Sequence, residues 1–420
     1  MTAVFTPEDV IAATGASWLS QGGAASFDGV STDTRTLGPG SLFLALTGEK
    51  FDGHAFVREA VKRGACGIVA SRRIETEPGV HVFQVADTLQ ALQDLARFHR
   101  RRFQIPVVAV TGSNGKTSTK DMLAVVLGSV MSVLKTEANF NNEIGLSQTL
   151  LRMQSGHEAV VVEMGMRAPG EIAGLAAIAL PTVGVVTNVG ETHIECLGSI
   201  ENIAAAKAEL ACAISESGRI ILNGDDPRVR GMRDKTAAKA VLYGLQPDCD
   251  VKAVQLEHKP EGVRFRCEAG SVSFSVSLPV PGIHNVYNAL AAIATGLELG
   301  VTPEAVARGL AGYEPGKMRL NIRQYGEITV IDDTYNASPL SMAAALDVLA
   351  STAQGRKVAV IGDMLELGES GPAAHRRVGV QLAAAGVAAV VTLGGLAALA
   401  GAVASEKGIS AVACSDHASA

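Results

Sequence analysis

The sequence lacks the paired cysteines that are typical of zinc sites and disulfide-rich domains. No two of its cysteines form a C-x-x-C pair, which argues against both kinds of site and fits a reducing cytosol. A basic stripe is also missing, because the net charge is -6 and no run of lysine and arginine is longer than Arg100 to Arg102. We therefore expect no nucleic-acid partner, and partners that are small anions held locally. The cysteines are Cys66, Cys196, Cys212, Cys249, Cys267 and Cys414.

Signals for export or membrane insertion are missing as well. The N-terminal stretch MTAVFTPEDV carries Glu8 and Asp9 where a signal peptide needs positive charge and a long apolar core. Leu382 to Ala404 contains no charge and is long enough to cross a bilayer. Its apolar character is mostly alanine, however, and glycines interrupt it, so we interpret Val387 to Leu393 as a buried parallel strand between two helices. We expect a cytoplasmic protein without a membrane span.

The stretch Val107 to Lys120, VVAVTGSNGKTSTK, is the strongest local signal that is present. An apolar β-type run leads into a glycine turn followed by Lys116 and Thr117, which is typical of a phosphate-binding loop. Its backbone amides would point into one concavity at the positive end of the next helix, while Lys116 would reach the phosphates and Thr117 would hold Mg²⁺. The general P-loop pattern has glycine where Val110 stands. We expect ATP to bind here with Mg²⁺.

Length and apolar runs predict an α/β fold with three domains. A chain of 420 residues, 47% of them apolar, exceeds the size that one hydrophobic core supports. Residues 1–84 read as a small N-terminal α/β domain. Residues 85–313 read as a central domain with a P-loop-type, mostly parallel sheet flanked by helices and with ligands at the carboxyl ends of its strands. Residues 314–420 read as a C-terminal Rossmann-like α/β domain.

Individual strands are expected where apolar runs stand between helical patterns. In the central domain these runs are Ala159 to Val162, Val183 to Val186 and Ile220 to Leu222, and in the C-terminal domain they are Ile328 to Ile331, Lys357 to Ile361 and Ala389 to Leu393. Between Asp250 and Leu278 the apolar residues alternate with period two, which predicts antiparallel strands. Gly312 to Gly316 is the expected hinge before the third domain.

Polar side chains follow two of the central runs. Glu163 ends VVVE, where a carboxylate could reach a metal shared with Thr117. The alternative is a solvated loop acid. Asn188 and His193 follow the next run, and a lone histidine is more often a packed or surface residue than a ligand.

Two further sets of polar residues can be explained either by a functional role or by an ordinary structural one. Lys207, in the helical stretch IAAAKAEL, taken alone reads as an ordinary helix-surface lysine. Asp332, Asp333 and Asn336 end a strand of the third domain, where they could bind ribose hydroxyls or cap the next helix.

Together these motifs resemble the Mur ligases of bacterial cell-wall synthesis, over nearly the whole length. Members of this family have the phosphate loop T-G-[ST]-N-G-K-T, which accounts for Val110. STDTRTLGPGSLFLALTGEKFDGH is similar to the family's UDP-sugar domain, and KTEANFNNEIGLSQTLL to its muramoyl-substrate segment. DDTYNASP and GDMLELGE favour the members that add D-alanyl-D-alanine to UDP-N-acetylmuramoyl-tripeptide, and the D-N-P-R motif of the preceding ligase is absent.

The resemblance implies an ATP-dependent amide ligase that works through an acyl phosphate, acts as a monomer, and uses ATP, Mg²⁺, the muramoyl tripeptide and the dipeptide. Carried over by position, it implies catalytic roles for Lys116, His193 and Lys207. Thr117 and Glu163 would hold one Mg²⁺, and His193 with a carbamylated Lys207 would serve the second. The nucleotide would be bound by Gly112, Ser113, Asn114, Gly115, Lys116, Thr117, Ser118, Asn285, Arg319 and Asp333. The substrates would be bound by Ser31, Thr32, Asp33, Arg35, Asn139, Asn141, Asn142 and Asn336.

The chain departs from the family pattern in two places. Ser147 and Gln148 stand where relatives usually have a proline-containing pair. Relatives also continue past the position of Ala420 through a further strand and a K-G-S-R-type segment, so we expect a truncated third domain.

Several functions stay open on the sequence alone. The alternatives are another Mur-type ligase, either third-residue-adding or folate-type, and a non-catalytic P-loop regulator. A nucleic-acid-dependent ATPase is least favoured because of the acidic balance.

Overall fold

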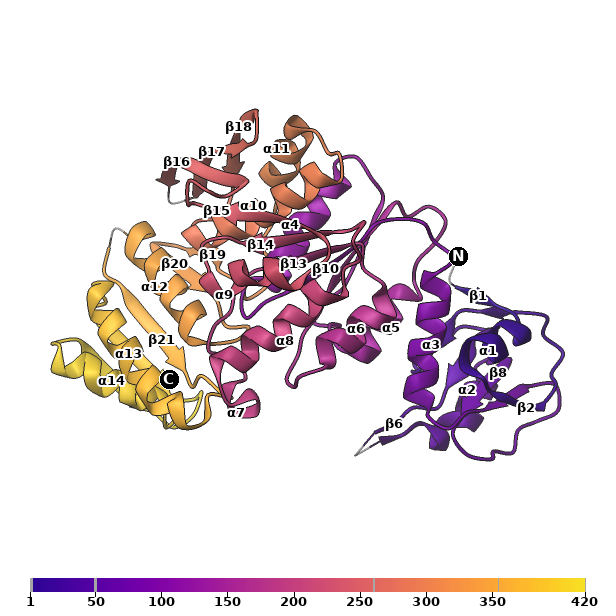
Figure 1. The fold of residues 1–420 in the computed structure, drawn as a ribbon. Helices are drawn as coiled ribbons and strands as arrows, with labels where there is room; N and C mark the ends of the chain where they lie inside the picture. The colour runs from indigo at the N-terminus through magenta and orange to yellow at the C-terminus, as the bar shows by residue number, and fades with distance from the viewer. Residues whose placement is uncertain (1–2, 49–50, 260, 354, 420) are drawn as a thin grey trace. The chain divides into compact units, whose positions relative to one another are not determined.

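The computed structural model describes residues 3–48, 51–259, 261–353 and 355–419 (Figure 1). The chain divides into two compact units. The first contains residues 1–109, 131–164 and 173–181, and the second contains residues 110–130, 165–172 and 182–420. The three domain boundaries expected from the sequence stay predictions. Glu49 and Lys50 of the expected UDP-sugar stretch, and Met1, Thr2 and Ala420, lie outside the described residues.

A small α/β layer forms the N-terminal part of the first unit, as predicted. Its five-stranded sheet has the order β2-β9-β8-β5-β4. All neighbours are parallel except β2 and β9. The strands are β2 (Ser17–Ser20), β4 (Val30–Ser31), β5 (Leu42–Leu44), β8 (Gly67–Ala70) and β9 (His81–Gln84), and the helices are α1 (Pro7–Thr14), α2 (Val57–Lys62) and α3 (Thr88–Arg100).

A nine-stranded sheet carries the central part of the chain, in the order β11-β12-β10-β13-β14-β15-β16-β17-β18. β10 (Val107–Thr111), β12 (Ala159–Glu163) and β13 (Val183–Val186) are buried at every position. This is why the sequence shows them as continuous apolar runs rather than alternating ones. The others are β11 (Val133–Lys135), β14 (Arg219–Asn223), β15 (Lys239–Gly244), β16 (Val251–Lys259), β17 (Gly262–Ala269) and β18 (Val272–Leu278).

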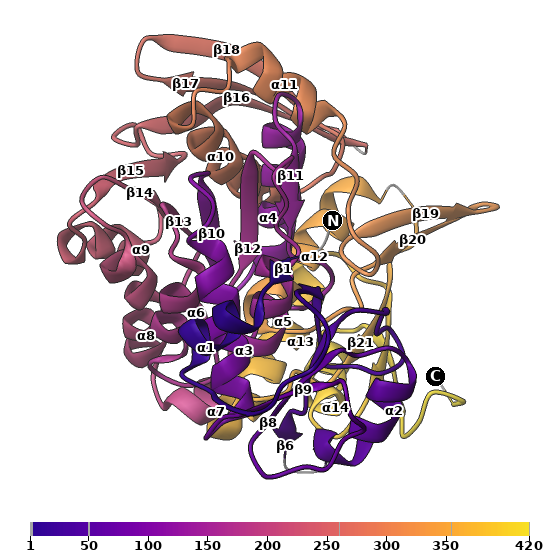
Figure 2. The ribbon, with the colours of Figure 1, turned by 90° about the vertical axis from the view of Figure 1, so that its right-hand side faces the viewer.

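Strand direction within this sheet agrees with the sequence pattern. β13, β14 and β15 pair in parallel, whereas β16, β17 and β18 are antiparallel. In the second unit, α4 (Lys116–Gly128) packs on α10 (Ile283–Glu298) and α11 (Pro303–Ala311), and α11 also packs on β18. Figures 1 and 2 both show β16–β18 beside α11 at one end of this unit. Also present are α5 (Glu143–Leu150), α6 (Glu171–Ala179), α7 (Ile194–Leu197), α8 (Ile200–Ala213) and α9 (Pro227–Arg230).

The C-terminal part of the second unit has a parallel sheet of β21 (Val358–Gly362), β22 (Ala389–Leu393) and β23 (Ser410–Cys414). Its core is formed with α13 (Gly371–Ala384) and α14 (Ala397–Glu406), with α12 (Pro339–Thr352) against α13. The uncharged stretch Leu382 to Ala404 is therefore strand β22 between two helices, as predicted. Within the described ranges, no helix has the length and apolar character that a bilayer crossing needs.

One expected strand of this part pairs differently. β20 (Ile328–Asp332) forms an antiparallel hairpin with β19 (Asn321–Tyr325) rather than a strand of the parallel sheet. Gly326, at φ 60°, makes the tight turn between them, and such a turn favours pairing with the adjacent strand.

Candidate active site

The predicted phosphate loop connects β10 to α4 and has room only for glycine at two positions. Gly112 has φ 150° and Gly115 has φ 79°. A Cβ atom at position 112 would overlap the Thr187 hydroxyl, and one at position 115 would overlap the Asn288 side-chain oxygen. Glycine is therefore required both by the backbone conformation and by the close neighbours.

Hydrogen bonds from the segment after β13 fix the shape of this loop. The Asn114 amide donates to Asn188 Oδ1 at 2.9 Å, and Thr187 Oγ1 donates to the Asn114 carbonyl at 2.6 Å. Ser113 Oγ donates to the Gly190 carbonyl at 3.1 Å. The loop is thus held in one conformation by protein contacts, which is what a preorganised anion site requires.

The loop leads directly into the positive end of a helix. α4 begins at Lys116, after Gly115 as its N-cap residue, which has no side chain to cap the helix, and Thr117 and Ser118 lie in its first turn. Lys116 Nζ donates to the carbonyls of Gly112 at 2.9 Å and Ser113 at 3.2 Å. An ammonium group and a helix N-terminus together favour a bound phosphate.

Lys207 is buried in α8, so the expectation of an ordinary helix-surface lysine is wrong. Only 2% of this residue is exposed. Burial lowers the pKa of Lys207 well below its usual range, and the charge of Lys116 lowers it further. Burial thus disfavours the charged amine relative to the neutral one, and the neutral amine is the form that reacts with carbon dioxide to give a carbamate.

His193 lies just before α7, at the left-handed φ of 56°. Its Nδ1 forms a hydrogen bond with the Glu366 carboxylate. Burial lowers the pKa of His193; Glu366 opposes this effect, and Lys116 and Lys207 add to it. The second unit thus brings Lys116, His193 and Lys207 into one electrostatic neighbourhood, as expected for residues that act on an anionic substrate.

Glu163 is placed by the first unit, at the end of β12, and is not a solvated loop acid. It is 2% exposed. Its Oε1 accepts a hydrogen bond of 2.8 Å from Asn141 Nδ2, and its amide donates to Thr136 Oγ1 at 3.1 Å. The structure therefore joins a predicted metal ligand to a predicted substrate-binding residue.

The other predicted substrate residues of the first unit lie in two polar loops. Ser31 and Asp33 form a turn in which the Ser31 hydroxyl donates to the Asp33 carbonyl, and the Asp33 carboxylate pairs with Arg35. Gln148 Nε2 donates to Thr32 Oγ1 at 2.9 Å. In the second loop, Asn139 accepts from the Asn141 amide, and Asn142 caps α5 through Gly145. Gln148, a departure from the family pattern, thus binds the loop that contains Ser31.

The predicted nucleotide residues beyond the phosphate loop occupy two places in the second unit. Asn285 is 6% exposed in α10, and its Nδ2 donates to the Pro281 carbonyl at 2.8 Å. The Arg319 guanidinium stacks on the Tyr335 ring at 4.0 Å. Asp333 accepts from the Leu320 amide, and its burial raises its pKa to about 6. Asn336, a predicted substrate residue, is exposed on the loop before α12.

The predicted metal ligands suit Mg²⁺, which binds with few protein ligands, better than a metal that needs several protein ligands. In the part of the chain that the structure describes, no three His, Cys, Asp or Glu side chains converge on one metal position. Mg²⁺ commonly uses one or two protein ligands with substrate phosphates and water. A carboxylate and a hydroxyl are donor types that suit this ion, and the predicted ligands that offer them would be Glu163 and Thr117.

Sequence reasoning missed several residues that support this site. Glu366 was noticed only as part of GDMLELGE. Ser338, 5% exposed at the start of α12, donates to Asn114 Oδ1 at 3.2 Å. Neither has a local signal, because each acts through a partner more than 170 residues away along the chain.

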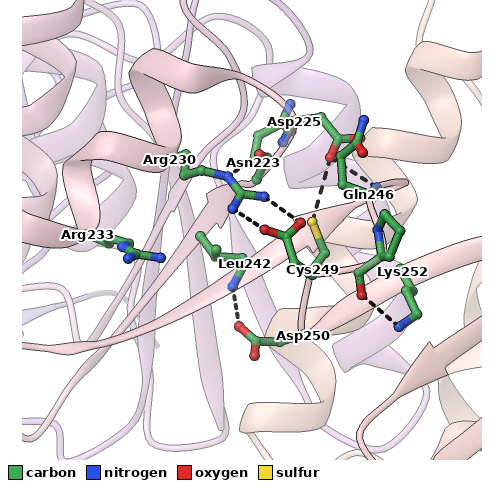
Figure 3. Close-up of polar contacts among 12 residues, drawn as sticks. Asn223, Asp225, Arg230, Arg233, Leu242, Gln246, Cys249, Asp250 and Lys252 are labelled. Carbon is green, nitrogen blue, oxygen red and sulfur yellow. Dashed lines mark hydrogen bonds and ion pairs between the residues drawn. The ribbon is translucent and has the colours of Figure 1, made fainter.

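A second polar cluster at the ends of β14 and β15 was also missed (Figure 3). Asp225 accepts hydrogen bonds from the Leu245 amide at 2.7 Å, the Tyr287 hydroxyl at 2.8 Å and the Cys249 thiol at 3.6 Å. Burial, with the nearby Asp225 charge, raises the pKa of Cys249 to about 11, so this thiol stays protonated near neutral pH. Asn223 donates to the Thr187 carbonyl at 2.9 Å, so this cluster supports the segment that holds the phosphate loop.

Comparison with known proteins agrees with this arrangement. Residues 26–100 match the family model described as "Mur ligase family, catalytic domain", residues 110–296 match "Mur ligase middle domain", and residues 318–420 match "Mur ligase, glutamate ligase domain". The UDP-N-acetylmuramoyl-tripeptide--D-alanyl-D-alanine ligase of Bacillus subtilis (strain 168) is 42% identical over 373 residues, covering 88% of this chain and 80% of the relative.

Solved structures give the same result. MurF from Acinetobacter baumannii superposes with a TM-score of 0.92 at 34% identity, covering 98% of this chain and 90% of that one. MurF ligase from Thermotoga maritima, in complex with ADP, has a TM-score of 0.83 at 31% identity, covering 92% and 88%. The chain therefore belongs to the Mur ligase family.

Proposed function

We propose that the chain is an ATP-dependent ligase that joins D-alanyl-D-alanine to UDP-N-acetylmuramoyl-tripeptide in the synthesis of a peptidoglycan precursor. The observation that carries the proposal is the glycine-restricted loop of Gly112 to Gly115, fixed from β13 and followed by Lys116 at a helix N-terminus. The relatives named for this reaction support the choice of substrates.

The proposed reaction has two steps. The terminal carboxylate of the tripeptide attacks the γ-phosphorus of ATP, giving an acyl phosphate and ADP. The amine of the dipeptide then attacks the acyl carbon, and phosphate leaves as the amide forms. Little covalent work falls to the protein, since positioning and charge neutralisation dominate phosphoryl transfer.

Residues that match the family pattern by position would bind and orient the nucleotide. Lys116 and the amides of the loop would hold the β- and γ-phosphates, and Asn285 would contact adenine. Arg319 and Asp333 would approach the nucleotide when the third domain closes on the hinge at Gly312 to Gly316. Closure would exclude water, which otherwise hydrolyses the acyl phosphate.

Mg²⁺ would be held by Thr117 and Glu163, with a second ion served by His193 and a carbamylated Lys207. Its chemistry would be to offset the charge of the phosphates. The burial of the Lys207 amine, which lowers its pKa, supports the carbamate. The loops of Ser31 to Arg35 and of Asn139 to Asn142, with Asn336, would bind the substrates.

An assay of ADP release tests the proposal. With UDP-N-acetylmuramoyl-tripeptide and ATP, we expect turnover only when D-alanyl-D-alanine is added. Lys116→Ala should lower this turnover at least about 100-fold while the fold stays intact. Lys252→Ala, on β16 of the same unit, is the control and should stay near wild type.

Other results of the same assay would refute the assignment. ADP release with a single amino acid in place of the dipeptide would indicate a third-residue-adding or folate-type ligase. Nucleotide binding without any turnover would indicate a regulator. We propose a cytoplasmic monomer. Sedimentation of the purified protein would test the oligomeric state, and fractionation of cells would test the location.

A further inference from the structure

Glu366 contacts His193 from a distant part of the second unit. Its carboxylate pairs with Nδ1 of the imidazole. With the proton on Nδ1 donated to this carboxylate, the lone pair of Nε2 is left free to face a ligand. Glu366 itself is half-exposed, its side chain being 41% accessible, so the pair is not a requirement of a closed core.

Both residues of this pair have a left-handed backbone conformation. His193 has φ 56° and Glu366 has φ 61°, although neither is glycine. The Glu195 amide donates to the Glu366 carbonyl at 3.2 Å, which ties the two segments together. Sparsely populated backbone conformations persist only where surrounding contacts maintain them. They occur most often at functional sites.

An ion pair also joins the segment before His193 to α13, without touching the imidazole. Arg377 of α13 pairs with Glu191 at 2.7 Å. The segment around His193 is therefore contacted at two independent points, and of these two contacts the one from Glu366 includes the imidazole. This separation makes it possible to distinguish orientation of the histidine from simple attachment of the segments.

We propose that Glu366 is a positioning residue that fixes the tautomer and direction of the His193 imidazole toward Mg²⁺. The inference rests on the proposed function, in which His193 serves the second ion. Histidines that bind metals commonly donate their other ring N–H to a carboxylate, and loss of that partner typically costs about 10–100-fold in metal affinity.

The test is a titration with Mn²⁺, followed by electron paramagnetic resonance of the free ion, on the full chain with a nonhydrolysable ATP analogue bound. We expect Glu366→Ala to weaken the second Mn²⁺ about 10–100-fold. Glu366→Gln should weaken it less, because the amide oxygen still accepts the Nδ1 proton. Arg377→Gln, the matched control, should stay within about twofold of wild type, and thermal unfolding of each variant checks the fold.

The outcomes distinguish the positioning role of Glu366 from the proposal that His193 binds the metal. If His193→Ala weakens Mn²⁺ but Glu366→Ala does not, the positioning role is wrong and the metal ligand stands. If His193→Ala has no effect, both are wrong. If Arg377→Gln weakens Mn²⁺ as much as Glu366→Ala does, the contact serves only to attach the segments, and the inference is overturned.

Discussion

The backbone at Gly112 leaves no room for a side chain. A methyl group there would overlap the Thr187 hydroxyl, at a φ that L-residues rarely adopt. We expect Gly112→Ala to abolish binding of a fluorescent ATP analogue and to lower the free energy of unfolding by about 1–3 kcal/mol. Urea unfolding and analogue titration would measure the two effects.

Gly128→Ala is the matched control for this change. Gly128 ends the same helix that the loop begins, and a Cβ atom there meets nothing within 4 Å. The variant should bind the nucleotide normally and gain up to about 1 kcal/mol of stability, since alanine is the better helix former. Normal nucleotide binding by Gly112→Ala would contradict the proposed phosphate site.

Asp333 should make the protein less stable as it ionises. Burial raises its pKa to about 6 from an ordinary 3.8, so its contribution is present in full below 3.8 and is lost as the pH rises through 6. Asp333→Asn keeps an oxygen for the Leu320 amide. It should raise the free energy of unfolding at pH 7.5 by about 1–3 kcal/mol, and the gain should vanish near pH 4.

Urea unfolding of both proteins across this pH range would measure the difference. Asp416→Asn is a suitable control, because Asp416 is exposed and hydrogen bonds lower its pKa instead. If Asp333→Asn raised the free energy of unfolding equally at every pH, burial would not be destabilising the ionised Asp333 carboxylate.

The limits of sequence reasoning follow from how each residue acts. The glycines and Lys116 were predictable because the loop is one continuous motif whose backbone conformation is encoded locally. Lys207 is buried because α8 packs its lysine face inward, which its alanine neighbours do not reveal. Glu366 acts on His193 across 173 residues, so no local pattern could indicate it.

Helix α12 is capped by a residue that also contacts the phosphate loop. Ser338 Oγ accepts from the Ser341 amide in a capping box and donates to Asn114 Oδ1. We expect Ser338→Ala to cost about 0.5–2 kcal/mol of stability, as for other N-cap losses, and also to weaken nucleotide binding several-fold. Thermal unfolding and nucleotide titration would measure these effects.

Thr302→Ala provides the comparison for this cap. Thr302 caps α11 through the Ala305 amide and, among the described residues, makes no hydrogen bond to the phosphate loop. The variant should therefore lose similar stability and keep its nucleotide affinity. Equal affinities for the two variants would show that the Ser338 contact does not influence the phosphate loop.

Strands were predictable where burial dictates the pattern. β10, β12 and β13 show continuous apolar runs because they are buried at every position, and only the last residues of β10 and β12 are polar. β16–β18 alternate as half-exposed antiparallel strands do. The pairing of β20 was not predictable in the same way. Its apolar residues fit either a sheet or a hairpin, and the turn at Gly326 decides between them.

For the chain as a whole, the predicted ligand contacts divide between the two compact units. The phosphate loop, His193, Lys207, Asn285 and Asp333 belong to the second unit, whereas Ser31 to Arg35 and Asn139 to Asn142 belong to the first. Glu163, the proposed Mg²⁺ ligand, is the exception on the nucleotide side, since it lies in the first unit. The nucleotide and the UDP-sugar should therefore stabilise different sets of peptides.

Hydrogen exchange measured by mass spectrometry tests this division. A ligand that binds only the folded state raises the free energy of opening by about 2.7 kcal/mol at a concentration 100 times its Kd, and exchange becomes slower as a result. A nonhydrolysable ATP analogue with Mg²⁺ should slow exchange in peptides covering 112–118 and 187–190. The UDP-N-acetylmuramoyl-tripeptide alone should slow exchange in 31–35 and 139–142. Peptides of β16–β18, which contain no proposed ligand contact, should exchange at the same rate in all samples. Protection of 31–35 by the nucleotide, with 112–118 unchanged, would reverse the assignment of the two sites.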